Sequence, residues 1–422
     1  MKIAYIVGGF PVLSETFIVN QIAGMVARGA DVDILVTAKR AGKASHLPEA
    51  VVRHQLMERV LRVGAPRNVL VRLLRLLPLL LLHGWRRPGV VGRSLNVVRH
   101  GRSAATLALL YTALTLVRHG VRPYDVVHAQ FGAFGPLALQ LMEIGVLQGK
   151  LVTSFRGYDA TTYLRAHPHV FDRLFRDGRC FLPVSAALAR HIIEAGCDPA
   201  RIHVHHSGIQ CAKFRYQEKT RGPDEITKVV LVGRLVEKKG LGYALQAIGK
   251  VIASGRQVCA TIIGNGPLRA ALQKQIDEMG IHAQVSMVGS KPHDEVLALM
   301  AQSHILMAPS VTAGDGDEEG IPNTLKEAMA LGLPVLSTVH AGIPELVEDG
   351  RSGFLVPERD SDALAERLMQ LVHQPETWAT LGRAGRARID AEFCIENQCD
   401  KLQQLYQSLL ESSEAREYGA RP

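Results

Sequence analysis

The amino-acid sequence predicts an α/β protein made of two doubly wound, Rossmann-like domains. Short, nearly unbroken apolar runs alternate with amphipathic stretches of helical period along most of the chain. This alternation is typical of parallel sheets that are covered by helices on both faces. The pattern occurs twice, and a polar segment at residues 217–228 separates the two occurrences. The chain has 422 residues, which is more than one ordinary hydrophobic core accommodates.

In the first half, apolar runs that end in glycine or polar turns predict the strands. They lie at residues 2–9, 31–38, 124–131, 150–157 and 181–185. Amphipathic periodicity predicts helices at residues 15–29, 135–145 and 186–196. Residues 103–117 have Leu107, Leu110, Leu114 and Val117 at helical spacing, so we expect a core helix there.

The second half repeats the pattern. Strands are expected at residues 228–235, 258–266, 283–290, 305–310, 333–338 and 353–356, and helices at 242–255, 268–280, 293–303 and 324–331. We expect domains at 1–208 and 209–390, with a C-terminal helix at 391–422 that packs back on the first domain and ends in a frayed tail. In doubly wound folds ligands bind outside the carboxyl ends of the strands, so the site is expected in the cleft between the domains.

Charge is distributed unevenly. Residues 1–200 hold 25 Lys and Arg against 12 Asp and Glu, and the remainder holds 24 against 28. The basic surplus centres on residues 59–124, which contain twelve Arg and no acid. Arg- and Leu-rich helices suit anionic lipid surfaces. We expect membrane contact through Arg72, Arg75, Arg86 and Arg87, with insertion by Leu73, Leu77, Leu80 and Leu81.

Two alternatives remain for this basic segment. It is a solvated helical face if its leucines pack on the core. Nucleic acid is a disfavoured partner because the segment has neither interleaved aromatic residues nor a nucleic-acid-binding motif.

Localisation signals predict a cytoplasmic protein that associates peripherally with the inner face of the plasma membrane. Every apolar run is shorter than the ~20 residues needed to span a bilayer, and no signal peptide is recognised at the start. Six cysteines without metal-ligand spacing predict reduced thiols and no zinc site.

Three segments predict an anion site in the second domain. Gly233, Arg234 and Lys239 follow its first strand, and Gly264–Pro267 form a second tight turn. Arg contacts phosphate through a fork and Lys as a point charge. The third segment is the start of the helix near Pro322, where free amides favour an anion.

Glu319 and Glu327 flank that helix start. Eight residues of helix span about 12 Å, whereas a glycosidase pair needs roughly 5–9.5 Å. The spacing therefore favours hydroxyl acceptors on either side of a phosphate over paired acid–base catalysis. The neighbouring Asp315, Asp317 and Glu318 are expected to face solvent ahead of the helix.

The motifs "GRLVEKKG", "IIGNGPLRAAL", "LMAPS", "EGIPNTLKE" and "HAGIPELVEDGRSGFLV" resemble glycosyltransferase family 4, retaining nucleotide-sugar enzymes of the GT-B fold. The resemblance is nearly unbroken over residues 229–356. In the first half, "GGFPVLSETFI", "VVHAQFG" and "SFRGYD" resemble exopolysaccharide members of the colanic acid and amylovoran type.

The resemblance implies a role for each matching position. Arg234 and Lys239 would hold the donor diphosphate, with Gly8, Gly9, Gly233, Gly264 and Gly266 in the loops around it. Glu327 would bind ribose. Glu319, with the backbone of Gly320, Ile321, Pro322 and Asn323, would bind the donor sugar, and His128 would lie near it. Catalysis would involve His128, Glu319, Arg234 and Lys239, without a metal ion or another cofactor.

Several of these residues have structural alternatives. His128 ends a strand and fits a core histidine as well. Arg156 and Asp159 are either acceptor contacts or a structural ion pair. Glu15 is either an acceptor contact or a cap of a helix that begins at Ser14.

The resemblance implies transfer of a hexose from a nucleotide diphosphate sugar, with UDP-hexose ahead of GDP-mannose, to a lipid-linked oligosaccharide. Two alternatives remain: a nucleotide-sugar 2-epimerase of the same fold, and a catalytically silent subunit of a polysaccharide assembly. The intact "GRLVEKKG" and Glu319–Glu327 motifs disfavour both.

Overall fold

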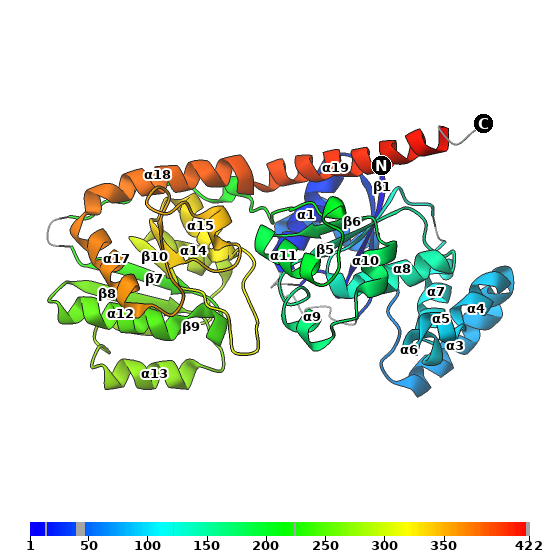
Figure 1. Ribbon diagram of the computed structural model, residues 1–422, viewed down its shortest axis with the longest axis horizontal. Coiled ribbons are helices and arrows are strands. Elements are labelled where there is room, and N and C mark those ends of the chain that lie inside the picture. Colours follow the sequence, from blue (N-terminus) through cyan, green and yellow to red (C-terminus); the bar gives the residue numbers. More distant parts are fainter. Residues whose placement is uncertain (13–14, 39–46, 121, 223–224, 419–422) are drawn as a thin grey trace. The chain divides into compact units, whose positions relative to one another are not determined.

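The structure is a computed structural model that describes residues 1–12, 15–38, 47–120, 122–222 and 225–418, with side chains to residue 411. It divides into two compact units. Unit 1 comprises Met1–Pro183, His191–His205 and the chain from Cys399, and unit 2 comprises Val184–Arg190 and His206–Gln398. Each is an α/β domain (Figure 1).

Unit 1 is built on a six-stranded parallel sheet in the order β3-β2-β1-β4-β5-β6. The strands are β1 (Lys2–Val7), β2 (Asp31–Val36), β3 (Val60–Arg62), β4 (Val126–Ala129), β5 (Lys150–Phe155) and β6 (Cys180–Pro183). Most of their side chains are buried, because helices cover both faces of the sheet. The sequence did not predict β3, an edge strand whose side chains are partly or fully exposed and form no buried apolar run.

Helices α1 (Thr16–Ala27), α8 (Gly135–Glu143) and α11 (Ala186–Glu194) confirm the helices predicted in the first half. The shorter helices α2, α9 and α10 span Glu49–Arg53, Thr162–Ala166 and Asp172–Asp177. Residues 202–209 form no regular strand; they contribute the single bridges Phe181–Ile202 and Ile209–Cys394.

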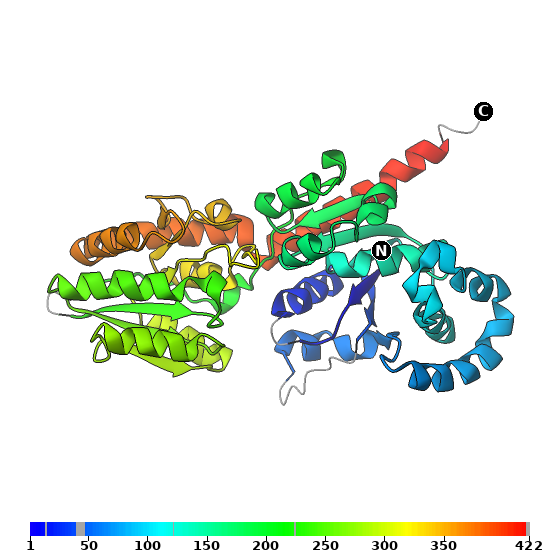
Figure 2. The same ribbon diagram turned by 60° about the horizontal axis from the view of Figure 1, so that its bottom comes forward.

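The basic segment folds as a group of helices within unit 1 (Figures 1 and 2). They are α3 (Val69–His83), α4 (Pro88–Ser94), α5 (Val97–His100), α6 (Arg102–Ala105) and α7 (Ala108–Arg118). Helix α3 packs on α7 through a small core of Leu76, Leu79, Leu110 and Leu114. The predicted core helix is confirmed at α7, which starts later than expected because Leu107 has a left-handed backbone conformation.

Unit 2 repeats the strand order of unit 1, as β12-β11-β10-β7-β8-β9. Its strands are β7 (Thr227–Val232), β8 (Val258–Ile263), β9 (Val285–Gly289), β10 (Ile305–Ala308), β11 (Val335–Thr338) and β12 (Phe354–Val356). All six were predicted. Both sheets therefore have the doubly wound order 3-2-1-4-5-6, in which the direction of winding reverses between the first and fourth strands.

The helices of unit 2 are α12 (Leu241–Ala253), α13 (Arg269–Glu278), α14 (His293–Ala301), α15 (Asn323–Leu331), α16 (Ile343–Leu346), α17 (Ser361–His373) and α18 (Trp378–Arg388). Helix α15 confirms the prediction for residues 324–331 within one residue. It ends at Gly332, whose φ of 88° suits a residue without a side chain.

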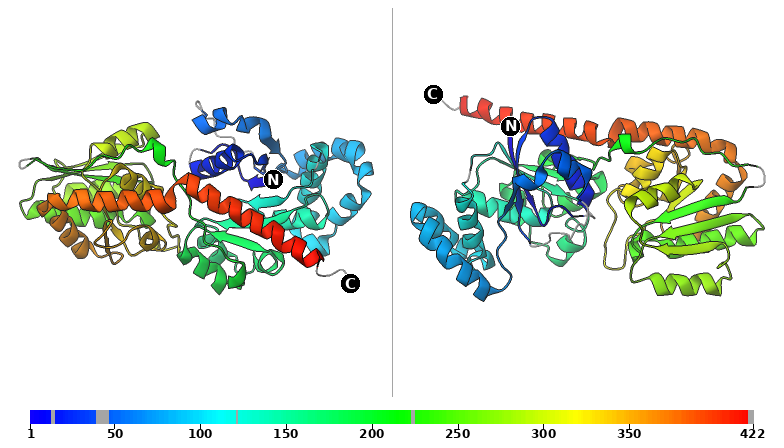
Figure 3. Two further views of the ribbon diagram at one scale, coloured as in Figure 1. Left: turned by 90° about the horizontal axis from the view of Figure 1, so that it is seen from above. Right: turned by 180° about the vertical axis from the view of Figure 1, so that it is seen from behind.

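The last helix, α19 (Ile395–Tyr418), starts in unit 2 and belongs to unit 1 from Cys399 onward. In unit 1 it lies along the sheet (Figure 3). Arg28 pairs with Asp400, Nε to Oδ1 at 2.7 Å, and the Cys399 thiol donates to the Gln21 carbonyl. Helix α1 and the end of the chain are thereby joined.

The prediction of six reduced thiols is wrong for two cysteines. Cys211 and Cys394 form a disulfide with a Cα–Cα separation of 5.5 Å. The parallel bridge between Ile209 and Cys394 brings these residues together across 183 positions of sequence. Asp390 lies beside the same sulfurs, but bonded cysteines offer no thiolate to a metal ion.

Within the described ranges, no helix combines the length and apolar composition needed to cross a membrane.

Candidate active site

The candidate site of unit 2 lies where its winding order reverses, at the neighbouring strands β7 and β10. The loop Gly233–Gly240 follows β7, and a long loop from Pro309 to Pro322 follows β10. Carboxyl ends of adjacent parallel strands meet at one edge of the sheet, so the two loops are brought into contact. Val311 N–H donates to the Lys238 carbonyl at 2.9 Å, which joins them.

Two lysines and two carboxylates form a charge cluster at this edge. Lys239 Nζ lies 3.0 Å from Glu319 Oε1, and Lys238 Nζ lies 3.5 Å from the same oxygen. Lys238 also contacts Asp317, Nζ to Oδ2 at 2.9 Å. The four side chains are between 11% and 24% exposed, so the cluster is largely, though not fully, shielded from solvent.

The charge state of Glu319 is set by this cluster. Burial alone would raise the pKa of its carboxyl, but the positive charges of Lys239 and Lys238 outweigh burial and lower the pKa to about 2. Glu319 is therefore ionised throughout the physiological pH range. It can accept hydrogen bonds but cannot act as a general acid there.

The prediction that the acids ahead of α15 face solvent is correct only for Asp315. Asp317 pairs with Lys238, and Glu318 is 9% exposed. The sequence could not show the pairing of Asp317, because its partner Lys238 is 79 residues away in the chain.

The cationic side chains differ in their surroundings. Arg234 is exposed, so its guanidinium can turn toward a ligand. Lys239 is held by Glu319, and its aliphatic stem lies against Gly233, where an added Cβ would meet Lys239 Cε at 3.2 Å. Gly233 thus leaves room for the Lys239 side chain to cross the loop.

The structure gives Gly264 and Gly266 a packing role. A Cβ at Gly264 would lie 1.8 Å from the Gly233 carbonyl oxygen, and one at Gly266 would lie 2.5 Å from that of Leu235. Leu235 N–H donates to the Asn265 carbonyl at 3.0 Å. The loops after β7 and β8 therefore touch backbone to backbone, which glycine permits.

The start of α15 supplies backbone donors. Pro322 occupies the N-cap position, and no side chain caps the helix. Gly320 and Pro322 are buried, whereas Ile321 and Asn323 are partly exposed. An uncapped helix start presents N–H groups and a positive dipole end to an anion.

Glu327 lies in α15 and contacts His293 at the start of α14. Its Oε1 is 3.1 Å from His293 Nε2. This hydrogen bond raises the pKa of His293. The Glu327 side chain is 13% exposed and that of His293 is 59% exposed, so a ligand can reach the pair from the His293 side.

The sequence missed His340 and Glu358, which support Glu319. The Glu319 N–H donates to His340 Nε2 at 3.0 Å, so the ring proton is on Nδ1 and donates to Glu358 Oε1 at 2.6 Å. Glu358 also accepts from the Thr312 N–H at 2.8 Å. His340 is 1% exposed. The quoted motif "HAGIPE" contains His340, but only the fold shows that it faces Glu319.

We predict that His340→Ala lowers the free energy of unfolding by about 1–3 kcal/mol, because the Glu319 N–H and the Glu358 carboxylate, both partly buried, lose their partner. Urea unfolding followed by circular dichroism measures this. His282→Ala, at an exposed position of the same unit, is the control and should change stability little. Equal stability of the two variants would contradict the supporting role of His340.

His128 of unit 1 lies inside a buried polar network. It is 0% exposed; Nδ1 lies 2.5 Å from the Tyr406 hydroxyl and Nε2 lies 2.7 Å from Ser154 Oγ. Burial, reinforced by Arg156, lowers the pKa of His128 well below its usual value. In this structure the neutral ring joins β4, β5 and α19 and has no exposed edge for a sugar.

Asp159 has a structural role in the turn after β5. The Asp159 carboxylate accepts from the N–H groups of Gly132, Arg156 and Gly157 at 2.7, 2.8 and 3.1 Å, so it organises the turn. Burial raises its pKa despite these bonds.

The Arg156 guanidinium contacts Gln130 and Gln21 and lies over the Phe17 ring at 4.6 Å. Burial lowers its pKa to about 10, while Asp159 and Glu15 act in the opposite direction. Glu15 occupies the N-cap position of α1 without a capping side-chain bond. The Glu15 side chain therefore does not cap α1. Ser14, the expected first residue of that helix, lies outside the described residues.

Gly8 and Gly9 follow β1 at the carboxyl edge of the unit 1 sheet. The Gly8 carbonyl accepts from the Ala38 N–H at 2.8 Å, and an added Cβ at Gly8 would meet the Phe134 ring at 3.1 Å. This loop is thus compact and packs against the turn after β4.

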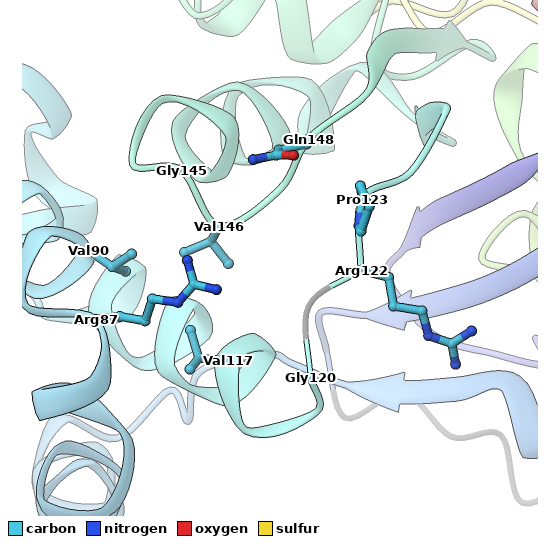
Figure 4. A pocket seen from close by; sticks show the side chains of 9 residues that line it. All are labelled: Arg87, Val90, Val117, Gly120, Arg122, Pro123, Gly145, Val146 and Gln148. Atoms are coloured by element: carbon cyan, nitrogen blue, oxygen red, sulfur yellow. The ribbon is translucent and has the colours of Figure 1, made fainter.

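Unit 1 also contains a cavity of about 280 Å³ at the amino ends of β4 and β5 (Figure 4). Arg87 points into it between Val117 and Val146, whereas Arg122 points away and pairs with Asp31. Ligands of doubly wound sheets bind at the opposite, carboxyl edge. The cavity therefore lies apart from the residues described above.

Comparisons with known proteins agree with this architecture. Residues 213–388 match the family of group 1 glycosyl transferases. The chain is 36% identical over 373 residues to WcaL of Salmonella typhimurium, assigned to colanic acid biosynthesis, covering 88% of this chain and 90% of that protein. It is 35% identical over 402 residues to the amylovoran biosynthesis glycosyltransferase AmsK of Erwinia amylovora, covering 93% and 96%.

Among solved structures, HepE of Anabaena in complex with UDP has a TM-score of 0.69 at 18% identity, covering 97% of this chain and all of that one. This likeness concerns the fold. Given the two sheets of identical winding and the two relatives matched over most of their length, the chain belongs to the group 1 glycosyltransferases of the GT-B fold.

Proposed function

We propose that this glycosyltransferase moves a hexose from a nucleotide diphosphate sugar to a lipid-linked oligosaccharide during synthesis of an exopolysaccharide or another surface polysaccharide. The observation that carries the proposal is the cluster of Lys238, Lys239, Asp317 and Glu319 at the carboxyl edge of unit 2. Its cations are suited to a diphosphate and its carboxylates to sugar hydroxyls. WcaL and AmsK, both assigned to exopolysaccharides, support the pathway class.

The donor is proposed to bind along the loops of unit 2. Arg234 and Lys239 take the diphosphate together with the amides at residues 320–323. Glu319 accepts from the sugar hydroxyls and Glu327 from the ribose. The glycines at 264 and 266 act indirectly, because they let the loops pack closely. UDP-hexose is the first candidate, since the fold relative HepE binds UDP.

The proposed reaction retains the anomeric configuration. The bond between the sugar C1 and the diphosphate oxygen breaks, and Arg234 and Lys239 stabilise the charge that develops on that oxygen. The acceptor hydroxyl forms the new bond to C1 on the same face, and its proton passes to the leaving phosphate. These side chains supply the positive charge, so we propose that no metal ion or other cofactor is needed.

Unit 1 is proposed to serve the acceptor. Arg156, with Glu15 nearby, is the charged group at its carboxyl edge suited to sugar hydroxyls. His128 is assigned as a positioning residue, because it holds Ser154 and Tyr406 and is buried. Gly8 and Gly9 shape the loop beside them. A lipid-linked acceptor places the enzyme at the cytoplasmic face of the membrane.

A screen of UDP-glucose, UDP-galactose and GDP-mannose by thermal shift tests the proposal. The nucleotide sugar that raises the melting temperature is then offered with a membrane extract, and transfer of labelled sugar to lipid is measured. A parallel reaction with a chelator tests metal independence. If no nucleotide sugar stabilises the protein, the proposed donor site is wrong.

We predict that Glu327→Ala weakens binding of the free nucleoside diphosphate roughly 10- to 150-fold. Hydrogen bonds to a charged group contribute about 1.5–3 kcal/mol, and the variant loses those to ribose. Isothermal titration calorimetry measures the affinity. Glu278→Ala, an exposed glutamate of α13, is the matched control. Wild-type affinity in Glu327→Ala would remove the ribose assignment.

A further inference from the structure

The surface of α3 and the 3-10 helix η3 (Gly84–Arg86) that follows it carries an exposed apolar strip. We name it the leucine face and define it as Leu70, Leu73, Leu74, Leu77, Leu81 and Trp85. Leu70, Leu74 and Leu81 are 70%, 76% and 68% exposed, and Trp85 is 70% exposed. Soluble proteins rarely leave so continuous an apolar strip in water without a partner.

Helical geometry separates this face from the packed one. Positions 70, 74, 77 and 81 are three or four residues apart and lie on one side of a helix with 3.6 residues per turn. Leu76 and Leu79 point to the other side and pack on α7. Helix α3 is thus apolar on both sides, a pattern that indicates an apolar environment beyond the protein's own core.

Charge around the leucine face selects the partner. Arg86 is exposed beside it and Arg75 is exposed on the same helix, whereas Arg87, another expected lipid contact, points into the cavity of Figure 4. Residues 59–124 contain no acid. The Arg86 guanidinium lies over the Trp85 ring at 5.3 Å. Leucines, an interfacial tryptophan and unopposed arginines together fit a bilayer with anionic headgroups. A purely apolar protein partner would leave the arginines without complementary charge.

The length of α3 decides how it would meet lipid. Its 15 residues span about 22 Å, which is less than the ~30 Å hydrocarbon core of a bilayer. The helix must therefore lie in the plane of the interface, with the leucine face toward the acyl chains.

The structure also rules out Arg72 and Leu80 as lipid contacts. Arg72 is buried, and its guanidinium donates to the Pro66 carbonyl at 2.9 Å and to that of Thr106 at 2.5 Å. Leu80 packs against the α3–α7 core. Arg72 and Leu80 hold the helices together, so substituting them would not test lipid contact.

We propose that the leucine face is a membrane-docking surface that inserts in-plane into an anionic bilayer. This inference draws on the proposed function only in that a lipid-linked acceptor requires membrane contact. Two forces act. The arginines are attracted to the anionic surface, and this attraction weakens as salt screens it. The contribution of leucine burial in lipid does not depend on screening.

Vesicle flotation tests the proposal. Wild type should float with phosphatidylcholine–phosphatidylglycerol vesicles at low salt and retain part of its binding at high salt. Arg75→Gln/Arg86→Gln should reduce the partition coefficient roughly 30-fold at low salt, at about 1 kcal/mol for each arginine. The matched control Arg179→Gln/Arg190→Gln changes two exposed arginines outside the helical group and should bind like wild type.

The apolar contribution needs its own variant. Leu74→Ser/Leu77→Ser/Leu81→Ser should lose the salt-resistant binding, at least on the order of 100-fold. These side chains are exposed, so the fold should persist, and thermal unfolding verifies this. Without vesicles, the leucine variant should hydrolyse the donor as fast as wild type does. This control distinguishes a failure of membrane docking from a failure of the glycosyltransferase assignment.

Trp85 offers an independent readout. The chain has two tryptophans, and Trp378 is 0% exposed, so a blue shift on adding vesicles reports Trp85. Trp85→Phe should abolish the shift.

Three outcomes would overturn the proposal: wild type stays with the sediment at low salt, the leucine variant floats as wild type does, or Trp85 emission is unchanged. Sedimentation equilibrium tests the alternative that the leucine face binds a second copy of the chain. Wild-type dimers that dissociate in the leucine variant, together with no flotation, would identify the face as an interface between copies.

Discussion

Lys239→Ala and Arg234→Ala should each lower the turnover number 100- to 1,000-fold at saturating donor. The proposed transition state develops negative charge on the leaving diphosphate, and removal of one preorganised donor from such a site costs about 2.7–4 kcal/mol of barrier. Donor affinity should change less, because the ground state carries less charge on the bridging oxygen.

The structure explains why Lys239→Ala should still fold. Lys238 lies 3.5 Å from Glu319 and keeps a cation beside that carboxylate. Steady-state kinetics with the donor identified by thermal shift measures both constants. Lys274→Ala, an exposed lysine of α13, is the control. Near-wild-type turnover in both site variants would show that the leaving-group assignment is wrong.

Gly240→Ala should destabilise the protein by about 2–5 kcal/mol and reduce donor binding. Gly240 has a φ of 62°, a left-handed conformation that costs a residue with a side chain about 1–2 kcal/mol. An added Cβ would also lie 1.8 Å from the Pro309 carbonyl oxygen, and overpacking of this kind costs about 1–3 kcal/mol. The loops after β7 and β10 would have to separate, which would move Lys239 away from Glu319.

Gly255→Ala is a matched control because it isolates the backbone effect. Its φ is 81° and nothing lies within 4 Å of the added Cβ. Urea unfolding of both variants gives the difference due to the loop contact. If the two variants lose equal stability, the contact between the loops is not tight in solution.

Much of the fold was predictable because local sequence determines it. Apolar runs predicted all six strands of unit 2 and five strands of unit 1, and the one strand they did not predict is β3, an edge strand that is not buried. The roles of Arg234, Lys239, Glu319 and Glu327 remain predictions that rest on the resemblance to glycosyltransferase family 4. The structure adds the ion pair of Lys239 with Glu319 and the contact of Glu327 with His293.

What local sequence could not provide are contacts between distant segments. From the sequence, Asp317 is expected to face solvent. In the structure, the loops after β7 and β10 are in contact, and Asp317 pairs with Lys238. His340 and Glu358 support Glu319 because their strands, β11 and β12, end at the same edge of the sheet. Cys211 and Cys394 bond through a bridge across 183 residues.

The sequence by itself determined the α/β class, the repeated strand–helix pattern, the family motifs and the basic character of residues 59–124. Periodicity and motif spacing are properties of short segments, and each segment folds with the preference of its own residues. Only the tertiary structure decided which arginine of the basic segment is internal, which leucines face outward and which histidine holds Glu319. Those outcomes depend on strand order and helix packing, which bring together side chains that no local pattern connects.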